Sequence, residues 1–559
     1  IQPTRLRAVC RLLRGRISAA PARNRGMRWH AICTYGKHTD CVRIEYAPCG
    51  DGSPENGAAQ QVEPGNHQHD QREPAEPLLI EPVLYLVAQR ETRQRRQNEH
   101  ARHRHGHLVE HARSEMRAHQ HLSYSPVGFL DDDLMKQGTK IHGVKVVGRI
   151  ADLRGIVEAN EVDEVIVSIP SATGREMQRI LDVCRETGVR LRRLPTEGDL
   201  VRLTQIRDVE VEDLLERSPV QLDEEQISAE LTGSRILVTG AGGSIGSEIC
   251  RQLMNFSPRR IILVDRWETG QFFLERELRQ AAPEAEIEVL IADLLDKNRI
   301  RSVLEEYRPE VLFHAAAYKH VPLMEAHPGE AVKNIVTATR NLADLASEGG
   351  VDTFVMISTD KAVNPTSVMG ASKRIAEIFT QALNSENGTR FITTRFGNVL
   401  GSNGSVIPLF REQISKGGPV TVTHPEITRY FMTIPEACQL VLEAGAMGKG
   451  GEIYIFDMGE SIKIVDLAKK MIMLSGLTLG SDIQIKFTGL RPGEKLYEEL
   501  LNDEENTLPT HHPQIMIAKE KEFDLKTVSK QVKDLIALDN SLDALTIVGK
   551  MKEIAPEFV

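Results

Sequence analysis

The sequence lacks any run of apolar residues long enough to cross a membrane, which takes about 18 to 20 consecutive residues. Its longest apolar stretch, PLLIEPVLYLVA at 77–88, is short and is interrupted by Glu81 and Pro82. The Arg-rich first residues have no apolar core behind them, so no signal peptide is expected. These absences argue against a membrane-spanning or secreted protein and predict a cytoplasmic one.

Cysteine is scarce and positive charge is not in excess. Four of the seven cysteines fall within the first 49 residues without the spacing of a metal site. Cys184, Cys250 and Cys438 are isolated, which predicts buried thiols in a reducing compartment and no bound metal. The net charge of −10 argues against a general nucleic-acid binder, which normally carries a basic domain.

The composition changes sharply near residue 122. Residues 1–122 hold 18 Arg but one Lys, and 11 of the 18 His. The run RQRRQNEHARHRHGH at 93–107 has neither a helical nor a strand period. We interpret 1–122 as a disordered or anomalous segment, such as an out-of-frame reading. The alternative is a His-rich metal tract or a basic arm.

Two α/β regions follow. In 123–205, short β-rich runs alternate with helical stretches at 149–160 and 172–187, which predicts a small parallel lobe. This lobe resembles a truncated nucleotide fold, and without an opening glycine-rich turn it is expected to bind no nucleotide. A charged linker is predicted at 206–232.

The main domain is predicted at 233–520 and is followed by a helical tail at 521–559. Its strand runs are RILVTG (235–240), RIILVD (260–265), IEVLIAD (287–293), VLFHAAA (311–317), TFVMIS (353–358) and RFITTRFGN (390–398). Six strands with intervening helices predict the α/β class with a doubly wound parallel Rossmann sheet. After about residue 400 the alternation fades into segments punctuated by Gly and Pro, typical of a small C-terminal substrate lobe.

The first turn of this domain has the pattern of a dinucleotide site. VTGAGGSIGSEI at 238–249 contains Gly240, Gly243 and Gly246 directly after a strand and at the start of a helix. Such glycines allow a tight turn and close approach to a pyrophosphate. Asp265 ends the second strand, 19 residues after Gly246, where a carboxylate holds ribose hydroxyls and favours NAD over NADP. The adjacent Arg266 leaves NADP open.

A second motif carries the chemistry. In STDKAVNPTSVMGASKR at 358–374, Thr359, Met369 and Lys373 have the spacing of a nicotinamide-dependent hydride-transfer site in which Tyr normally occupies the middle position. Methionine can transfer no proton, so Met369 is either a core residue of a silenced site or the mark of a site whose acid and base lie elsewhere. Asp360 and Lys361, at the strand end, offer such an acid and base.

Six motifs in order resemble one family, the nucleotide-sugar 4,6-dehydratases of polysaccharide biosynthesis. The resemblance covers about residues 125–520 and rests on TGAGGSIGSE, HAAAYKHVPLME (314–325), STDKAVNPTSVMGASKR, RFGNVLGSNGSVIPLF (395–410), ITRYFMT (427–433) and GLRPGEKLYEEL (489–500). These are extended short-chain dehydrogenase/reductases that act on UDP-N-acetylglucosamine. Long members commonly have Met where short ones have Tyr, so the resemblance makes Met369 a subtype mark.

The resemblance implies an NAD-dependent lyase, retaining at C5, that serves capsule, O-antigen or other glycan synthesis. Lys361 would be the base and Asp360 the acid, with Thr359 and Lys373 positioning sugar and cofactor; either Asp360 or a water held by Thr359 would take the C4 hydroxyl proton. Long relatives often have a membrane anchor, and a homo-oligomer is expected.

The remaining site residues follow from the motifs and the resemblance. The expected cofactor-binding residues are Gly240, Gly243, Ser244, Ile245, Gly246, Asp265, Arg266, Asp293, Leu294, Ala315, Ala316, Ala317 and Lys373. The expected substrate-binding residues are Lys319, His320, Asn398, Arg429, Arg491 and Glu494, with the arginines on the UDP pyrophosphate.

Two alternatives stay open at this point. A nucleotide-sugar 4-epimerase shares the fold and the first hydride step but needs no Asp360–Lys361 pair. A non-catalytic nucleotide-binding regulator would explain Met369 but has no physical use for Thr359, Asp360, Lys361 and Lys373 together.

Overall fold

The structure is a computed structural model, and by internal contacts the chain forms two units, 1–79 and 80–559. The residues it describes are 31–32, 45–46, 83–89, 124–141, 143–160, 162–168, 174–193, 207–214, 220–384, 388–501, 506–519, 522–541 and 543–559. In the first unit, strands β1 (Ala31–Ile32) and β2 (Glu45–Tyr46) pair antiparallel. The predicted lack of order in most of 1–122 lies outside the described residues.

Residues 80–214 contain a seven-stranded sheet. Its order is β5-β6-β4-β3-β7-β8-β9, with β3 (Val83–Gln89), β4 (Tyr124–Leu130), β5 (Lys140–Ile141), β6 (Val144–Gly148), β7 (Glu164–Ser168), β8 (Arg190–Arg193) and β9 (Arg207–Asp208). Helices α3 (Leu153–Asn160) and α4 (Gly174–Thr187) share its core with Val165 and Val167.

The predicted start of this lobe at residue 123 is wrong. Strand β3 lies within the segment expected to have no fold and pairs antiparallel with both β4 and β7. Its sequence VLYLVAQ is the apolar run that is too short for a membrane span. A short apolar run fits a central strand equally well, because a strand inside a sheet needs only five to ten residues.

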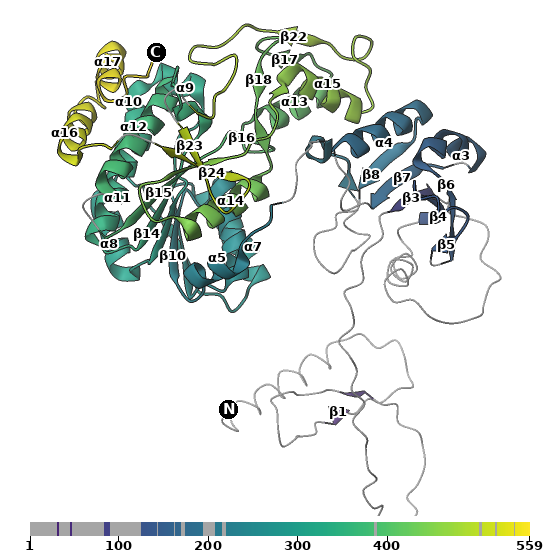
Figure 1. The fold of residues 1–559 in the computed structure, drawn as a ribbon, viewed down its shortest axis with the longest axis horizontal. Coiled ribbons are helices and arrows are strands. Elements are labelled where there is room, and N and C mark those ends of the chain that lie inside the picture. The colour runs from purple at the N-terminus through teal and green to yellow at the C-terminus, as the bar shows by residue number, and fades with distance from the viewer. Residues whose placement is uncertain are drawn as a thin grey trace, which may run out of the picture. The chain divides into compact units, whose positions relative to one another are not determined.

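The main domain is built on a nine-stranded sheet (Figure 1). Its order is β12-β11-β10-β13-β14-β15-β20-β24-β23, with β10 (Arg235–Thr239), β11 (Arg260–Asp265), β12 (Ile287–Ile291), β13 (Val311–His314), β14 (Thr353–Ile357), β15 (Arg390–Arg395), β20 (Ile453–Phe456), β23 (Asn506–Pro509) and β24 (Ile515–Lys519). The first seven in this order are parallel, and β24 and β23 are antiparallel additions. The six predicted strands and the doubly wound α/β class are confirmed.

Helices cover both faces of this sheet, because alternate strand residues point to opposite sides. Leu237, Ile262 and Val264 face one core, whereas Ile236, Ile261 and Leu263 face the other. The first core includes α8 (Lys297–Tyr307), α11 (Ala338–Glu348), α12 (Val368–Asn384), α16 (Leu525–Ile536) and α17 (Ala544–Ile554). The second includes α5 (Glu224–Leu231), α6 (Ser244–Leu253), α7 (Glu268–Ala281) and α14 (Ile434–Met447).

The predicted linker at 206–232 therefore needs a correction. Its last part forms helix α5, whose Ile227 and Leu231 are buried in the second core. These residues lie four apart and so share one helix face, a signal that the surrounding acidic residues obscure.

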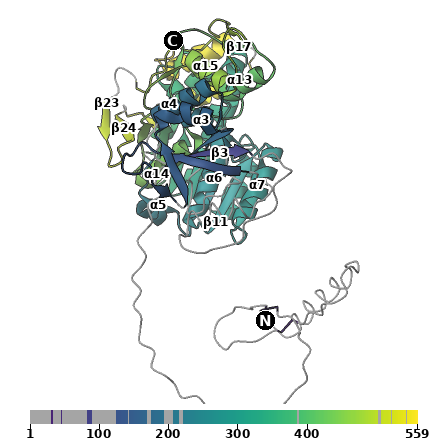
Figure 2. The ribbon, with the colours of Figure 1, turned by 90° about the vertical axis from the view of Figure 1, so that its right-hand side faces the viewer.

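A small lobe forms after residue 400 and gathers at one end of the domain in both ribbon views (Figures 1 and 2). Its core combines α13 (Val406–Ser415), α15 (Ile464–Leu474), β17 (Val420–Val422) and β22 (Ile485–Phe487). Short pairs link it further: β16 (Asn398–Val399) with β19 (Phe431–Met432), and β18 (Thr428–Arg429) with β21 (Ile462–Lys463). The chain returns to the main sheet through α14 and β20, so the lobe is assembled from separate segments.

Two short helices, α9 (Val321–Ala326) and α10 (Pro328–Ala331), follow β13 and lead through a π-helical turn at Val332–Thr337 into α11. None of the described helices is both long and apolar enough to span a membrane.

Candidate functional site

The glycine-rich turn between β10 and α6 is packed too closely for side chains. Gly240 has a φ of +69°, and a Cβ there would lie 2.6 Å from the backbone nitrogen of Ala316. A Cβ on Gly246 would lie 2.1 Å from the carbonyl oxygen of Gly240. Gly243 is the N-cap residue of α6, so the first helical N–H groups, from Ser244 and Ile245 onward, stand at the turn. This backbone cradle fits the pyrophosphate of a dinucleotide.

The end of β11 braces this turn. The carboxylate of Asp265 accepts hydrogen bonds from the backbone N–H of Gly242 and of Trp267, both at 2.9 Å. Its neighbour Arg266 forms an ion pair with Asp293 at 3.2 Å and hydrogen bonds with Asn334 and Tyr318. Asp265 and Asp293, both expected to bind the cofactor, thus lie at one sheet edge, and each also contacts other groups of the protein.

The three alanines that follow β13, which are expected to bind the cofactor, lie beside the glycine-rich turn. The N–H of Ala315 donates to the carbonyl of Thr239 at 3.1 Å, and Ala316 contacts Gly240 as described above. Ala316 and Ala317 pack on the first core, in which Leu294 is buried. Small side chains let the strand end approach the glycine turn, so the residues present fit a dinucleotide.

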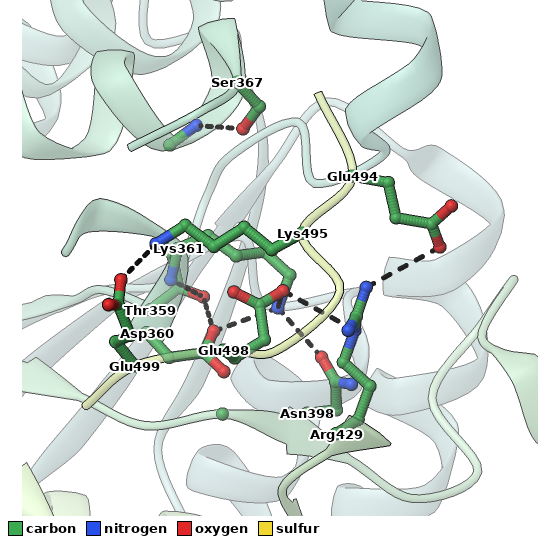
Figure 3. A network of polar contacts seen from close by, with 12 residues as sticks. Thr359, Asp360, Lys361, Ser367, Asn398, Arg429, Glu494, Lys495, Glu498 and Glu499 are labelled. Atoms are coloured by element: carbon green, nitrogen blue, oxygen red, sulfur yellow. Dashed lines mark hydrogen bonds and ion pairs between the residues drawn. The ribbon is translucent and has the colours of Figure 1, made fainter. Parts of the chain in front are cut away.

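The acid–base pair lies at the carboxyl end of β14. Asp360 is fully buried, and its Oδ1 accepts from Lys361 Nζ and from Thr359 Oγ1, both at 2.9 Å. Its second oxygen, Oδ2, has no hydrogen-bond partner among the described residues. The sequence thus brings Thr359, Asp360 and Lys361 into one hydrogen-bonded group (Figure 3).

Two residues from later in the chain, Asn398 and Glu498, also contact Lys361. Lys361 Nζ donates to Asn398 Oδ1 at 3.0 Å and lies 3.3 Å from Glu498 Oε1 (Figure 3). Burial disfavours the ammonium form, but Asp360 and Glu498 outweigh burial and raise the pKa of Lys361 above its usual value. The amine is therefore charged in this arrangement.

Arg429 links the same segment to the small lobe. Its guanidinium lies 3.5 Å from Glu498 and 3.6 Å from Glu494, and it donates to the carbonyl of Thr428 at 2.7 Å. Glu494, which is expected to bind the substrate, also accepts hydrogen bonds from Thr423 Oγ1 and from the backbone N–H of Arg491.

Met369 and Lys373 lie about one turn apart at the start of α12. Met369 is 4% exposed and packs in the first core. Lys373 Nζ donates to the carbonyl of Ile357 at 2.8 Å. Burial lowers the pKa of Lys373 to about 8, although Glu377 acts in the opposite direction.

Two other predicted substrate residues, Lys319 and His320, lie against the loop that follows β16. Lys319 Nζ donates to Ser402 Oγ at 3.3 Å, and burial lowers its pKa. His320 is the N-cap residue of α9, and burial and Lys319 lower its pKa. The Arg491 side chain is exposed, and its position on a pyrophosphate stays a prediction.

Glu498 is the site residue that the sequence did not predict. It lies in the GLRPGEKLYEEL motif at 489–500, four residues after Glu494. Three acidic residues in six make any one of them resemble a solvated surface charge. Only the fold shows which of these carboxylates lies near Lys361.

Within the described part of the chain, no group of three or more His, Cys, Asp or Glu side chains is arranged to hold a metal ion. The three described cysteines are buried thiols.

Comparison with known proteins gives two family matches. The model described as "Polysaccharide biosynthesis protein" matches residues 236–520, and the one described as "CoA-binding domain" matches residues 77–195. The second match begins before residue 83, in agreement with the position of β3.

Three relatives have similar sequences. The chain is 51% identical over 412 residues to the capsular polysaccharide biosynthesis protein CapD of Staphylococcus aureus, covering 72% of this chain and 68% of that protein. It is 48% identical over 414 residues to the probable polysaccharide biosynthesis protein EpsC of Bacillus subtilis, covering 73% and 69%. It is 34% identical over 278 residues to an inverting UDP-N-acetylglucosamine 4,6-dehydratase of Campylobacter jejuni, covering 49% and 79%.

Proposed function

Because this chain belongs to the polysaccharide biosynthesis protein family, we propose that it is an NAD-dependent nucleotide-sugar 4,6-dehydratase acting on UDP-N-acetylglucosamine. The observation that carries the proposal is the hydrogen-bonded Thr359–Asp360–Lys361 group, in which Asp360 is buried, at the sheet edge where α/β enzymes bind ligands. The similarity to the Campylobacter dehydratase supports the same sugar.

The cofactor would occupy the glycine turn, with Asp265 toward the ribose and Lys373 toward the nicotinamide side. NAD supplies a hydride acceptor for C4 of the sugar and a hydride donor for C6. Its regeneration in each turnover means that the residues need only hold it and shield it from water.

Asp360 has the contacts needed for the C4 hydroxyl proton in the absence of Tyr. Thr359 Oγ1 already donates to Asp360 Oδ1, so this hydroxyl can accept the C4 proton while its own proton passes to Asp360. Asp360 then returns that proton to the departing 6-hydroxyl, which leaves as water. Asp360 thus gains one proton and gives up one proton in each turnover, so no further acid is needed.

Lys361 would remove the C5 proton as a neutral amine and return it after C6 has been reduced. A single base that takes and returns the proton on one face of the ring retains the configuration at C5. We therefore propose retention, in contrast to the inverting Campylobacter relative.

The substrate's diphosphate would be held by Arg429 and Arg491, since a guanidinium binds phosphate through two hydrogen bonds. Asn398, Lys319 and His320 would contact the sugar. Self-association of the chain stays a prediction.

The test is proton NMR of UDP-N-acetylglucosamine incubated with the full-length protein in D₂O. We expect a new C6 methyl signal with deuterium at C5, and its loss in Lys361→Met. The isosteric pair Thr359→Val and Thr359→Ser separates the hydroxyl from the shape of the side chain: only the serine variant should keep activity.

Two outcomes would contradict the proposal. A sugar inverted at C4 without a methyl group would identify an epimerase. Binding of NAD with no change in the sugar would indicate the non-catalytic regulator. The configuration of the product at C5 tests retention separately; it is read from the H4–H5 proton coupling after the product of a reaction in H₂O has been chemically reduced at C4.

A further inference from the structure

Glu498 is a buried carboxylate with an unexplained oxygen. Its side chain is 2% exposed, and its Oε1 faces Lys361 Nζ at 3.3 Å and Arg429 Nε at 3.5 Å. Its Oε2 has no hydrogen-bond partner among the described residues. Burying a carboxylate oxygen without a hydrogen-bond partner costs folding free energy, which points to a further role for Glu498.

The proposed removal of the C5 proton requires Lys361 to be a neutral amine. Held between Asp360 and Glu498, the amine is an ammonium group and has no lone pair. It must lose one proton before it can accept the proton from C5.

Few of the groups near Lys361 can accept this proton. Asp360 is already occupied, because it has received the C4 hydroxyl proton. Asn398 offers an amide oxygen, which is too weak a base, and Arg429 is always charged. Glu494 faces Arg429 from the far side. Lys495 donates to Glu499 and to the carbonyl of Val363.

We propose that Glu498 is a positioning residue that stores the Lys361 proton during the elimination step. The inference rests on the proposed function. When Asp360 becomes neutral, one N–H bond of the Lys361 ammonium breaks and an O–H bond forms on Glu498 Oε1. The electron pair stays on Nζ, which then removes the C5 proton, and the pair's total charge does not change.

Burial favours this transfer once Asp360 is neutral. An ion pair without its second carboxylate loses part of its attraction, whereas a neutral amine and carboxylic acid avoid the cost of buried charge. The reverse transfer after C5 is reprotonated restores the starting group.

The experiment compares Glu498→Gln with Glu498→Asp in the full-length protein and with Glu499→Gln as a matched control. Glu499 is the adjacent, exposed carboxylate and pairs with Lys495 instead of Lys361. Two steps are measured with UDP-N-acetylglucosamine: formation of enzyme-bound NADH by its absorbance, and formation of the C6 methyl group by NMR.

For Glu498→Gln we expect NADH formation within about twofold of the parent and methyl formation slower by roughly 100-fold or more. The residual rate should rise about tenfold per pH unit, because Lys361 must then lose its proton to solvent. Glu498→Asp should recover part of the rate together with the parent's pH profile, and Glu499→Gln should match the parent.

Unchanged or faster methyl formation in Glu498→Gln would overturn the proposal, since it would mean that Glu498 only stabilises the ammonium form. Equal loss of NADH and methyl formation would overturn it as well, in favour of a structural role. If the parent protein itself forms NADH but no methyl group, the proposed dehydration has failed and the inference falls with it.

Discussion

At the scale of single residues, the two lysines of the STDKAVNPTSVMGASKR motif have opposite electrostatic environments. Lys361 lies between two carboxylates, and its pKa is raised. Lys373 faces the carbonyl oxygen of Ile357, and burial lowers its pKa to about 8. The difference follows from what surrounds each amine: two carboxylates outweigh burial at Lys361, whereas at Lys373 burial outweighs the single carboxylate of Glu377. One motif therefore holds one amine firmly charged and another that releases its proton near pH 8.

Lys373→Met should make stability less dependent on pH. In the unfolded chain a lysine keeps its proton to about pH 10.4, whereas folded Lys373 releases it near pH 8. The folded state is thus penalised below pH 8, and the penalty fades as the pH rises to about 10. Removing the amine should shift the stability difference between variant and parent by on the order of 2–3 kcal/mol between pH 7 and pH 10.

Urea unfolding at both pH values measures this difference. The lost hydrogen bond to Ile357 contributes equally at both and so cancels. Lys526→Met, on an exposed position of α16, is the control and should show a constant difference. A constant difference for Lys373→Met would contradict a buried amine with a lowered pKa.

At the scale of elements, the site is made where strands end and helices begin. The β10–α6 turn, the end of β11 and the end of β14 all lie at the carboxyl edge of the parallel strands. Small lobe segments bring Arg429 and Glu498 to the same group. Parallel strands place all their carboxyl ends at one edge, so residues 119 positions apart, such as Gly240 and Thr359, belong to one site.

Gly246→Ala should weaken dinucleotide binding. A Cβ at this position would lie 2.1 Å from the carbonyl oxygen of Gly240, so the turn and the helix N-terminus must separate. Fluorescence titration with NADH is expected to show weaker binding by at least tenfold, about 1.4 kcal/mol.

Gly549→Ala in α17 is the matched control, because a Cβ there would have no heavy atom within 4 Å. It should bind NADH normally and raise stability by up to about 1 kcal/mol, the helix preference of Ala over Gly. If Gly246→Ala bound NADH as tightly as the parent, the turn would not be the cradle of the cofactor.

At the scale of the whole main domain, the last residues complete a face of the fold. Helices α16 and α17 bury Val532, Leu535 and Met551 in the same core as α12. Arg374 of α12 forms an ion pair with Glu557 at 2.6 Å. The tail at 521–559 therefore supports the helix that carries Met369 and Lys373.

Leu535→Ala should lower the free energy of unfolding by about 2–5 kcal/mol, because it leaves a cavity in a close-packed core. Leu535 is 0% exposed, whereas Leu545, on α17, is 84% exposed. Leu545→Ala should accordingly change stability by no more than about 0.5 kcal/mol. Equal effects of the two changes, measured by urea unfolding, would contradict the packing of these helices on the domain.

Local patterns predicted much of this protein, and they failed where the signal was not local. The alternation of apolar runs and helical stretches predicted the six parallel strands, and the glycine spacing predicted the turn at Gly240. The strand at 83–89 was missed, because a short apolar run inside an Arg- and His-rich segment has no periodic neighbour to support it. Helix α5 was missed because its two buried residues are surrounded by charge.

The sequence by itself determined which residues could do chemistry, since side-chain type fixes what can donate, accept or carry a proton. Thr359, Asp360 and Lys361 are consecutive, so their proximity needed only a turn after a strand. Only the tertiary structure decided which of these groups carry a proton. Glu498 lies 137 residues after Lys361, and the fold places its carboxylate 3.3 Å from the amine. Burial and neighbouring charge, which set proton affinity, depend on which distant segments meet.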